Sequence, residues 1–133
     1  MDRVTADATH VVEEIYDRWN DGELARLIDR VDLAVVLVCD PLSPDESTLY
    51  GLEGWQQWVA RWGENYESMQ VAIDGLIPVS HEHVLALVSM TATPRGSDHE
   101  LRWAAAHVWT VQEGRIARWE AHVDIAVARG TLL

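Results

Sequence analysis

The chain has 133 residues, a length that suits one domain able to bury a substantial apolar core without a metal or a disulfide. Its formal net charge of −12 disfavours binding to nucleic acids and to anionic membranes, whose phosphates would be repelled. The single cysteine, Cys39, excludes an internal disulfide, and the opening MDRVTADATH has no apolar signal-peptide core. We therefore expect one domain over residues 1–133, located in the cytoplasm.

Two helices are predicted before any strand. Thr5–Asn20 places apolar residues at helical spacing, and the following Asp21-Gly22 is a typical helix stop. Glu23–Val31 repeats the pattern over a shorter length and predicts a second helix packed against the first. Leu33–Cys39 is continuous and β-branched, which is typical of a strand covered on both faces.

The middle of the chain predicts a loop, a third helix and two strands. Pro41–Tyr50 contains two prolines and an Asp-Glu pair, which indicates an exposed acidic loop. A helix opened by Gly51 then runs over Leu52–Tyr66 with a stripe of tryptophans at i, i+3 and i+7. The strands Ser68–Pro78 and Val84–Thr93 follow, the first with a bulge expected at its glycine.

The last strands form the best-defined hairpin, within Leu101–Asp124. In its first strand the odd positions are apolar, and in its second strand the apolar positions also alternate. A three-residue loop Gln112-Glu113-Gly114 pairs Val111 with Arg115 and places both apolar sets on one face, whereas a two-residue turn would mix them. We therefore predict the three-residue loop.

This order of elements predicts an α+β fold. A curved, mostly antiparallel sheet would form a cone-shaped half-barrel, with three helices packed on its concave face. Because helices cannot follow a strongly curved sheet, we expect a cavity between the two layers, where a small ligand could bind.

His107 is the strongest candidate for chemistry, since it lies on the apolar face of the hairpin among tryptophans. A neutral imidazole offers one donor and one acceptor, and it titrates near neutral pH. His107 could transfer a proton to a ligand in the cavity or hold that ligand by a hydrogen bond. Alternatively, it is a structural histidine bonded to a neighbour such as Tyr16.

Seven tryptophans and no phenylalanine suggest stacking against a flat hydrophobic ligand, although simple core packing explains such a stripe equally. The predicted pocket-lining residues are Trp19, Trp55, Trp58, Trp62, Trp103, Trp109, Trp119 and Met90. On the polar face of the hairpin, Glu120 and His122 share their side with Arg102 and Arg118, which indicates a salt-bridged surface or a dimer contact.

The chain resembles the SnoaL-like and ketosteroid-isomerase-like branch of the nuclear transport factor 2 superfamily. The resemblance rests on Asn20-Asp21-Gly22-Glu23, on Tyr50-Gly51-Leu52-Glu53-Gly54, and above all on HVWTVQEGRIARWEAHVD starting at His107. It implies a cone-shaped α+β half-barrel that forms a homodimer through the sheet. The family contains polyketide cyclases, isomerases, dehydratases and epoxide hydrolases.

The resemblance to ketosteroid isomerase also implies roles for single residues. Asp40, which precedes a proline at the end of the first strand, corresponds in position to the general-base aspartate of that enzyme; the alternative is a solvated turn residue. His107 corresponds in position to the acid that helps form the oxyanion hole. Ile15 takes the place of the helix tyrosine, and Tyr16 is one residue over, an offset of about 100° that would point its ring elsewhere. The candidate catalytic residues are Asp40, His107 and, despite this offset, Tyr16.

Two functions follow from these expectations. The chain is either a cofactor-independent cyclase, isomerase or dehydratase acting on an enolisable, polyketide-like or steroid-like substrate, or a non-catalytic binding or dimerisation module. No cofactor is expected, since the sequence has no Gly-rich phosphate loop and no nucleophile elbow. A metal site is not predicted either, because His81 and His83 lack a third ligand at suitable spacing.

Overall fold

The computed structural model describes residues 3–39 and 48–122, with side chains from Ala8 onward. Its elements are α1 (Arg3–Asn20), the 3₁₀ helix η1 (Leu24–Arg30), β1 (Val31–Val38), β2 (Thr48–Tyr50), α3 (Gly51–Asn65), β3 (Tyr66–Pro78), β4 (His83–Pro94), β5 (Leu101–Gln112) and β6 (Arg115–His122). The strands form one sheet in the order β2-β1-β6-β5-β4-β3. All neighbours in it are antiparallel except β1 and β6, which are parallel.

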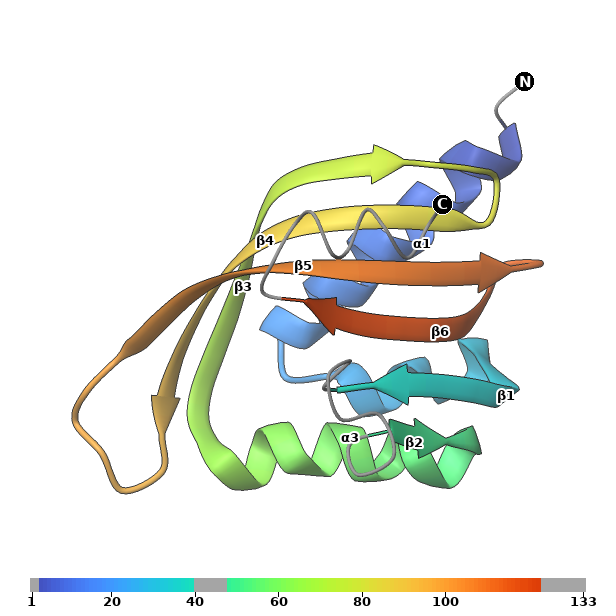
Figure 1. The fold of residues 1–133 in the computed structure, drawn as a ribbon. Helices are drawn as coiled ribbons and strands as arrows, with labels where there is room; N and C mark the ends of the chain where they lie inside the picture. The colour runs from blue at the N-terminus through green and yellow to red at the C-terminus, as the bar shows by residue number, and fades with distance from the viewer. Residues whose placement is uncertain (1–2, 40–47, 123–133) are drawn as a thin grey trace.

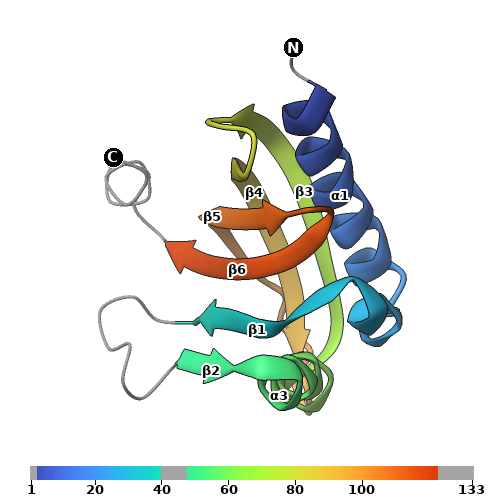
Figure 2. The same cartoon turned by 90° about the vertical axis from the view of Figure 1, so that its right-hand side faces the viewer.

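The sheet curves strongly and the helices lie on its concave side. Figure 1 shows the long strands β3, β4 and β5 bending along their length, and Figure 2 shows α1 lying beside the sheet along β3 and β4, with α3 at the end of the sheet where β1 and β2 lie. Helix α1 packs across β3, β4 and β5, while α3 packs on β1, β2 and β3. The predicted α+β half-barrel, open and mostly antiparallel, with helices on its concave face, is confirmed.

Helix α1 ends where its sequence predicts. The backbone N–H groups of Gly22 and Glu23 donate to the carbonyls of Trp19 and Arg18, which is the hydrogen-bond pattern of a Schellman cap. The second predicted helix is present as a seven-residue 3₁₀ helix, Leu24–Arg30. Neither segment, nor any other described helix, is long and apolar enough to span a bilayer.

Strand β1 is covered on both sides only in its second half. Leu33 is 77% exposed, whereas Val35 and Leu37 are fully buried, so the expectation of a strand covered throughout was wrong. Val31 pairs with Ile116 and Val36 with Arg118, so the register of β1 against β6 is irregular over residues 32–35, where Leu33 lies. The predicted acidic loop also ends early, because residues 48–50 form β2; residues 40–47 lie outside the described residues.

The hairpin turn has two residues, not the predicted three. Gln112 pairs with Arg115, so the turn is Glu113-Gly114, with φ of 53° and 77°. Positive φ at both positions is typical of a type I′ turn, for which a glycine at the second position is suited. One extra residue on β6, Ala117, forms a bulge between the pairs Thr110–Arg118 and Val111–Ile116. The bulge restores the apolar register that the shorter turn alone would have lost.

Candidate functional site

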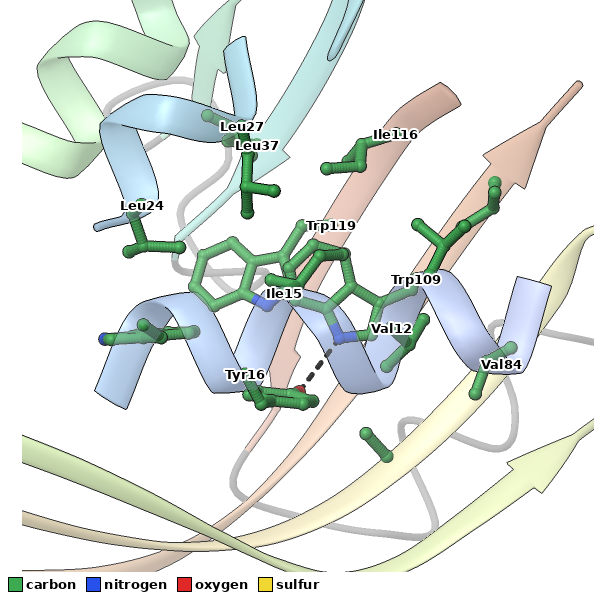
Figure 3. Close-up of a cluster of buried hydrophobic side chains, with 14 of the residues drawn as sticks. Val12, Ile15, Tyr16, Leu24, Leu27, Leu37, Val84, Trp109, Ile116 and Trp119 are labelled. Atoms are coloured by element: carbon green, nitrogen blue, oxygen red, sulfur yellow. Dashed lines mark hydrogen bonds between the residues drawn. The ribbon is translucent and has the colours of Figure 1, made fainter. Parts of the chain in front are cut away.

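The candidate site lies on the concave face, where α1 crosses the long strands (Figure 3). Helical spacing directs Tyr16 and Trp19 from α1 toward the sheet, and strand alternation directs His107 and Trp109 from β5 toward the helix. Trp119 joins them from β6, directly opposite Trp109 in the strand register. All five side chains are buried.

A chain of hydrogen bonds connects three of these residues. The Trp109 Nε1–H donates to the Tyr16 hydroxyl oxygen over 2.8 Å, and the same hydroxyl lies 2.7 Å from His107 Nδ1. An indole can only donate, so Tyr16 accepts from Trp109 and has its own proton to place. We assign that proton to His107 Nδ1, which makes Nδ1 an acceptor and puts the imidazole proton on Nε2.

Burial keeps the hydrogen-bonded groups of Tyr16 and His107 uncharged. Desolvation, together with the charge of nearby His122, lowers the pKa of His107 to about 3, so the ring is neutral at pH 7. Desolvation also raises the pKa of Tyr16 well above its ordinary value, although its hydrogen bond from Trp109 opposes the shift. His107 is therefore a neutral donor through Nε2, not a cationic acid.

Aromatic rings surround the imidazole. Trp19 stacks on His107 with centroids 6.0 Å apart and planes within 7°, and Trp119 meets it edge-on at 5.1 Å. Trp58 lies against both tryptophans, at 5.3 Å from Trp19 and 4.9 Å from Trp119. The histidine thus has polar bonding to Tyr16 and an aromatic environment, a combination that suits recognition of a flat molecule carrying an oxygen.

The comparisons with known proteins agree with this architecture. Residues 12–119 match the family model of the SnoaL-like domain. The chain belongs to the SnoaL-like family. A search of curated proteins finds no match.

Solved structures place this SnoaL-like chain in the nuclear transport factor 2-like fold. A protein of unknown function with that fold, from Burkholderia pseudomallei, has 20% identity and a TM-score of 0.76, over 92% of this chain and 94% of that one. TerC, co-crystallized with polyporic acid, has 16% identity and a TM-score of 0.75, over 93% and 96%. A candidate SnoaL-like polyketide cyclase from Jannaschia sp. CCS1 has 13% identity and a TM-score of 0.76, over 96% and 92%. At sequence identities of 20% or less, these similarities show the fold alone.

The predicted pocket residues of the SnoaL-like domain gather on its concave side. Six of them are buried, namely Trp19, Trp55, Trp58, Trp109, Trp119 and Met90, while Trp62 and Trp103 are half-buried and pack against the same core. This grouping agrees with both expectations for the tryptophans, core packing and ligand contact. Whether these residues line a ligand pocket stays a prediction.

The three predicted catalytic residues have different outcomes. His107 and Tyr16 are brought together, so the expectation that the one-residue offset turns Tyr16 elsewhere was wrong. Helix α1 packs on β3, β4 and β5, and Tyr16 lies on the face of α1 that meets β5, where its hydroxyl reaches His107. Asp40 lies outside the described residues. Within residues 3–39 and 48–122, no three metal-ligating side chains come together.

The outer face of the sheet carries the polar network expected for the hairpin. Arg118 donates to Glu120 at 2.6 Å and 2.9 Å, and Glu120 lies 3.2 Å from His122 Nε2. Burial alone would raise the pKa of Glu120, but the hydrogen bonds from Arg118 and His122 outweigh it and hold that pKa below its ordinary value. Arg102 pairs instead with Glu100. His122 is buried, so the network is only partly a surface one.

Sequence reasoning missed one functional partner, Trp109. It was expected as a lining residue, yet its indole fixes the direction of the hydrogen bonds in the site. The sequence contained a signal for this contact, because Trp109 and His107 are two residues apart in one strand and so lie on the same face.

Proposed function

We propose that this protein binds a small, flat, hydrophobic molecule between its helices and the concave face of the sheet, where His107 contacts an oxygen of that molecule. The carrying observation is the hydrogen-bond chain from Trp109 through Tyr16 to His107. Burying an imidazole and a phenol in an apolar core costs free energy unless their polar atoms are hydrogen-bonded. The hydrogen bonds among Trp109, Tyr16 and His107 leave the Nε2–H of His107 as the group for a ligand.

The catalytic form of this proposal is acid–base chemistry on an enolisable ketone of the polyketide-like or steroid-like kind. A base would take the proton beside the carbonyl, and the Nε2–H of His107 would stabilise the negative oxygen of the enolate that forms. Asp40, the residue after Cys39 at the end of β1, is our candidate for the base. The reaction would be a cyclisation, isomerisation or dehydration without a cofactor.

A non-catalytic binding or dimerisation module is the second candidate. It is favoured by the engagement of His107 Nδ1 with Tyr16, which suits a structural histidine. It is also supported by the outer face of the sheet, where Ala72, Ser89 and Ala104 are exposed and adjacent in register. Small side chains leave that face flat enough to pack against the sheet of a second copy.

Proton exchange separates the two candidates. In D₂O, the enzyme candidate should speed the loss of the α-protons of 2-tetralone, followed by NMR, above the rate in buffer. Asp40→Asn should abolish the acceleration without weakening binding, and His107→Asn should reduce it. Binding of 2-tetralone without any acceleration would leave a binding module, and absence of both would refute the proposed function.

We also propose that the protein works in the cytoplasm, since its one cysteine requires no oxidising compartment. Its net charge of −12 supports a small molecule, and not a nucleic acid or a membrane surface, as its partner.

A further inference from the structure

Five tryptophans in the described part of the chain bury an indole N–H that has no hydrogen-bond partner. They are Trp19, Trp55, Trp58, Trp62 and Trp119. Trp109 differs, since its N–H is bonded to the Tyr16 hydroxyl. The interior beside His107 is therefore rich in unused donors.

These five indoles form one group of touching rings, which we call the indole cluster. Trp58 is at its centre, with ring centroids 4.9 Å from Trp119, 5.0 Å from Trp55, 5.3 Å from Trp19 and 6.3 Å from Trp62. His107 adjoins the cluster through Trp19 and Trp119. Two of the unused donors, those of Trp19 and Trp119, therefore belong to rings that contact His107.

The cluster cannot satisfy these donors from its own side chains. Indole is a donor only, and the nearby acceptors, the Tyr16 oxygen and His107 Nδ1, are already engaged. Leaving a buried N–H unpaired destabilises the protein, because the group has lost its hydrogen bond to water. Tilted and edge-on ring pairs, such as Trp19–Trp58 at 74° and Trp58–Trp62 at 83°, allow weaker N–H···π contacts in the free protein.

A ligand's oxygen would be a better acceptor than a ring face. From this geometry we infer that the site selects flat ligands whose polar groups only accept hydrogen bonds, such as aromatic ketones and quinones. A hydrocarbon would leave the indole donors unpaired, and an alcohol or phenol would bring a proton for which the indole cluster, whose polar groups are all donors, has no acceptor. This inference rests on the proposed function and narrows its ligand class.

Three tricyclic probes of nearly the same shape test it: fluorenone with a carbonyl, fluorene with no polar group, and 9-fluorenol with a hydroxyl. None of them has an enolisable position, so binding is measured without chemistry. By isothermal titration calorimetry on the full chain, fluorenone should bind at least about tenfold more tightly than fluorene or 9-fluorenol, the ratio expected from one well-made hydrogen bond.

Trp58→Phe keeps a ring at the centre of the cluster and removes one donor. It should weaken fluorenone binding toward that of fluorene while leaving fluorene binding unchanged. Tyr50→Phe is the control, because Tyr50 is 68% exposed and lies outside the indole cluster. If Trp58→Phe fails to fold, the ratio of the affinities of the unmodified protein for the three probes tests the inferred preference.

Each outcome is informative. Equal affinity for fluorenone and fluorene, or tighter binding of 9-fluorenol, would overturn the inferred preference and leave the proposed binding function standing. An unchanged fluorenone affinity in a folded Trp58→Phe protein would also overturn it. No binding of any probe would overturn both the preference and the proposed function.

Discussion

At the scale of single residues, the Tyr16 hydroxyl is the group that determines the state of the site. It accepts from one side and donates to the other, so the tautomer of His107 depends on it. The same arrangement makes the site asymmetric, since Nδ1 is committed to the protein and Nε2 is directed elsewhere. Chemistry at His107 is therefore that of a hydrogen-bond donor.

Removing this hydroxyl should destabilise the protein. In Tyr16→Phe, the indole N–H of Trp109 and Nδ1 of His107 both lose their partner while the packing of the ring is kept. We expect the free energy of unfolding to fall by about 1–3 kcal/mol for each group left unpaired, measured by denaturant unfolding. Tyr50→Phe, at a position 68% exposed, is the control and should change little. Equal stability of the two variants would contradict the assigned hydrogen bonds.

His107 should also make the stability of the protein depend on pH. Its pKa is about 3 in the folded state and about 6.5 when exposed in the unfolded chain, so between these values the unfolded state binds more protons. The contribution of the neutral ring is complete above pH 6.5 and is lost as pH falls toward 3.

His107→Asn isolates this effect, because it cannot titrate and keeps an acceptor near Tyr16. The stability difference between wild type and variant, from urea unfolding, should shrink as pH falls from 7 to 4, while the carboxylates common to both cancel. A difference independent of pH would show that His107 is not the buried neutral group described here.

At the scale of elements, Asn20 joins the end of α1 to the middle of β3. Its side chain donates to the carbonyl of Val71 at 2.9 Å and accepts from the N–H of the same residue, and Gln70 donates to its backbone carbonyl. This joint fixes where α1 lies over the sheet, and hence where Tyr16 meets His107.

Asn20→Ala should therefore cost about 1–3 kcal/mol of unfolding free energy, because two backbone groups of β3 lose their partner. Asn20→Asp keeps the acceptor for the N–H of Val71 and loses only the donor, so we expect a smaller loss. Gln57→Ala, on the exposed side of α3, serves as the control. Denaturant unfolding of the three variants measures this, and an Asn20→Ala protein as stable as the control would refute the role of this joint.

The elements also show how far sequence periodicity reaches. It predicts α1, α3 and the four long strands, because each buries one face and so imposes a period on its residues. It did not predict the two-residue turn with a bulge at Ala117, because a three-residue loop produces the same alternation of faces. It also places Tyr16 among the buried residues of α1, as observed. The wrong expectation for the Tyr16 ring came from the residue-by-residue comparison with ketosteroid isomerase, and not from the helical pattern.

At the scale of the whole molecule, the proposed dimer has to overcome charge. Each copy carries a net charge of −12, so two copies repel one another over distances comparable with the Debye length. The row of Ala72, Ser89 and Ala104 offers contact by packing, and the Ser89 hydroxyl donates to the exposed carboxylate of Asp74, which adds negative charge beside it. Salt would therefore strengthen this dimer, whereas it would weaken one held by salt bridges.

Light scattering coupled to size exclusion measures this directly. We expect the mass of a dimer at about 0.5 M salt and a shift toward monomer at about 10 mM, because the Debye length grows from a few ångströms to about 30 Å. Ala104→Arg places a long charged side chain in the flat row and should give a monomer at both concentrations, while Gln57→Ala should behave as wild type. A wild-type monomer in high salt, or a dimer that salt dissociates, would exclude the sheet-to-sheet contact.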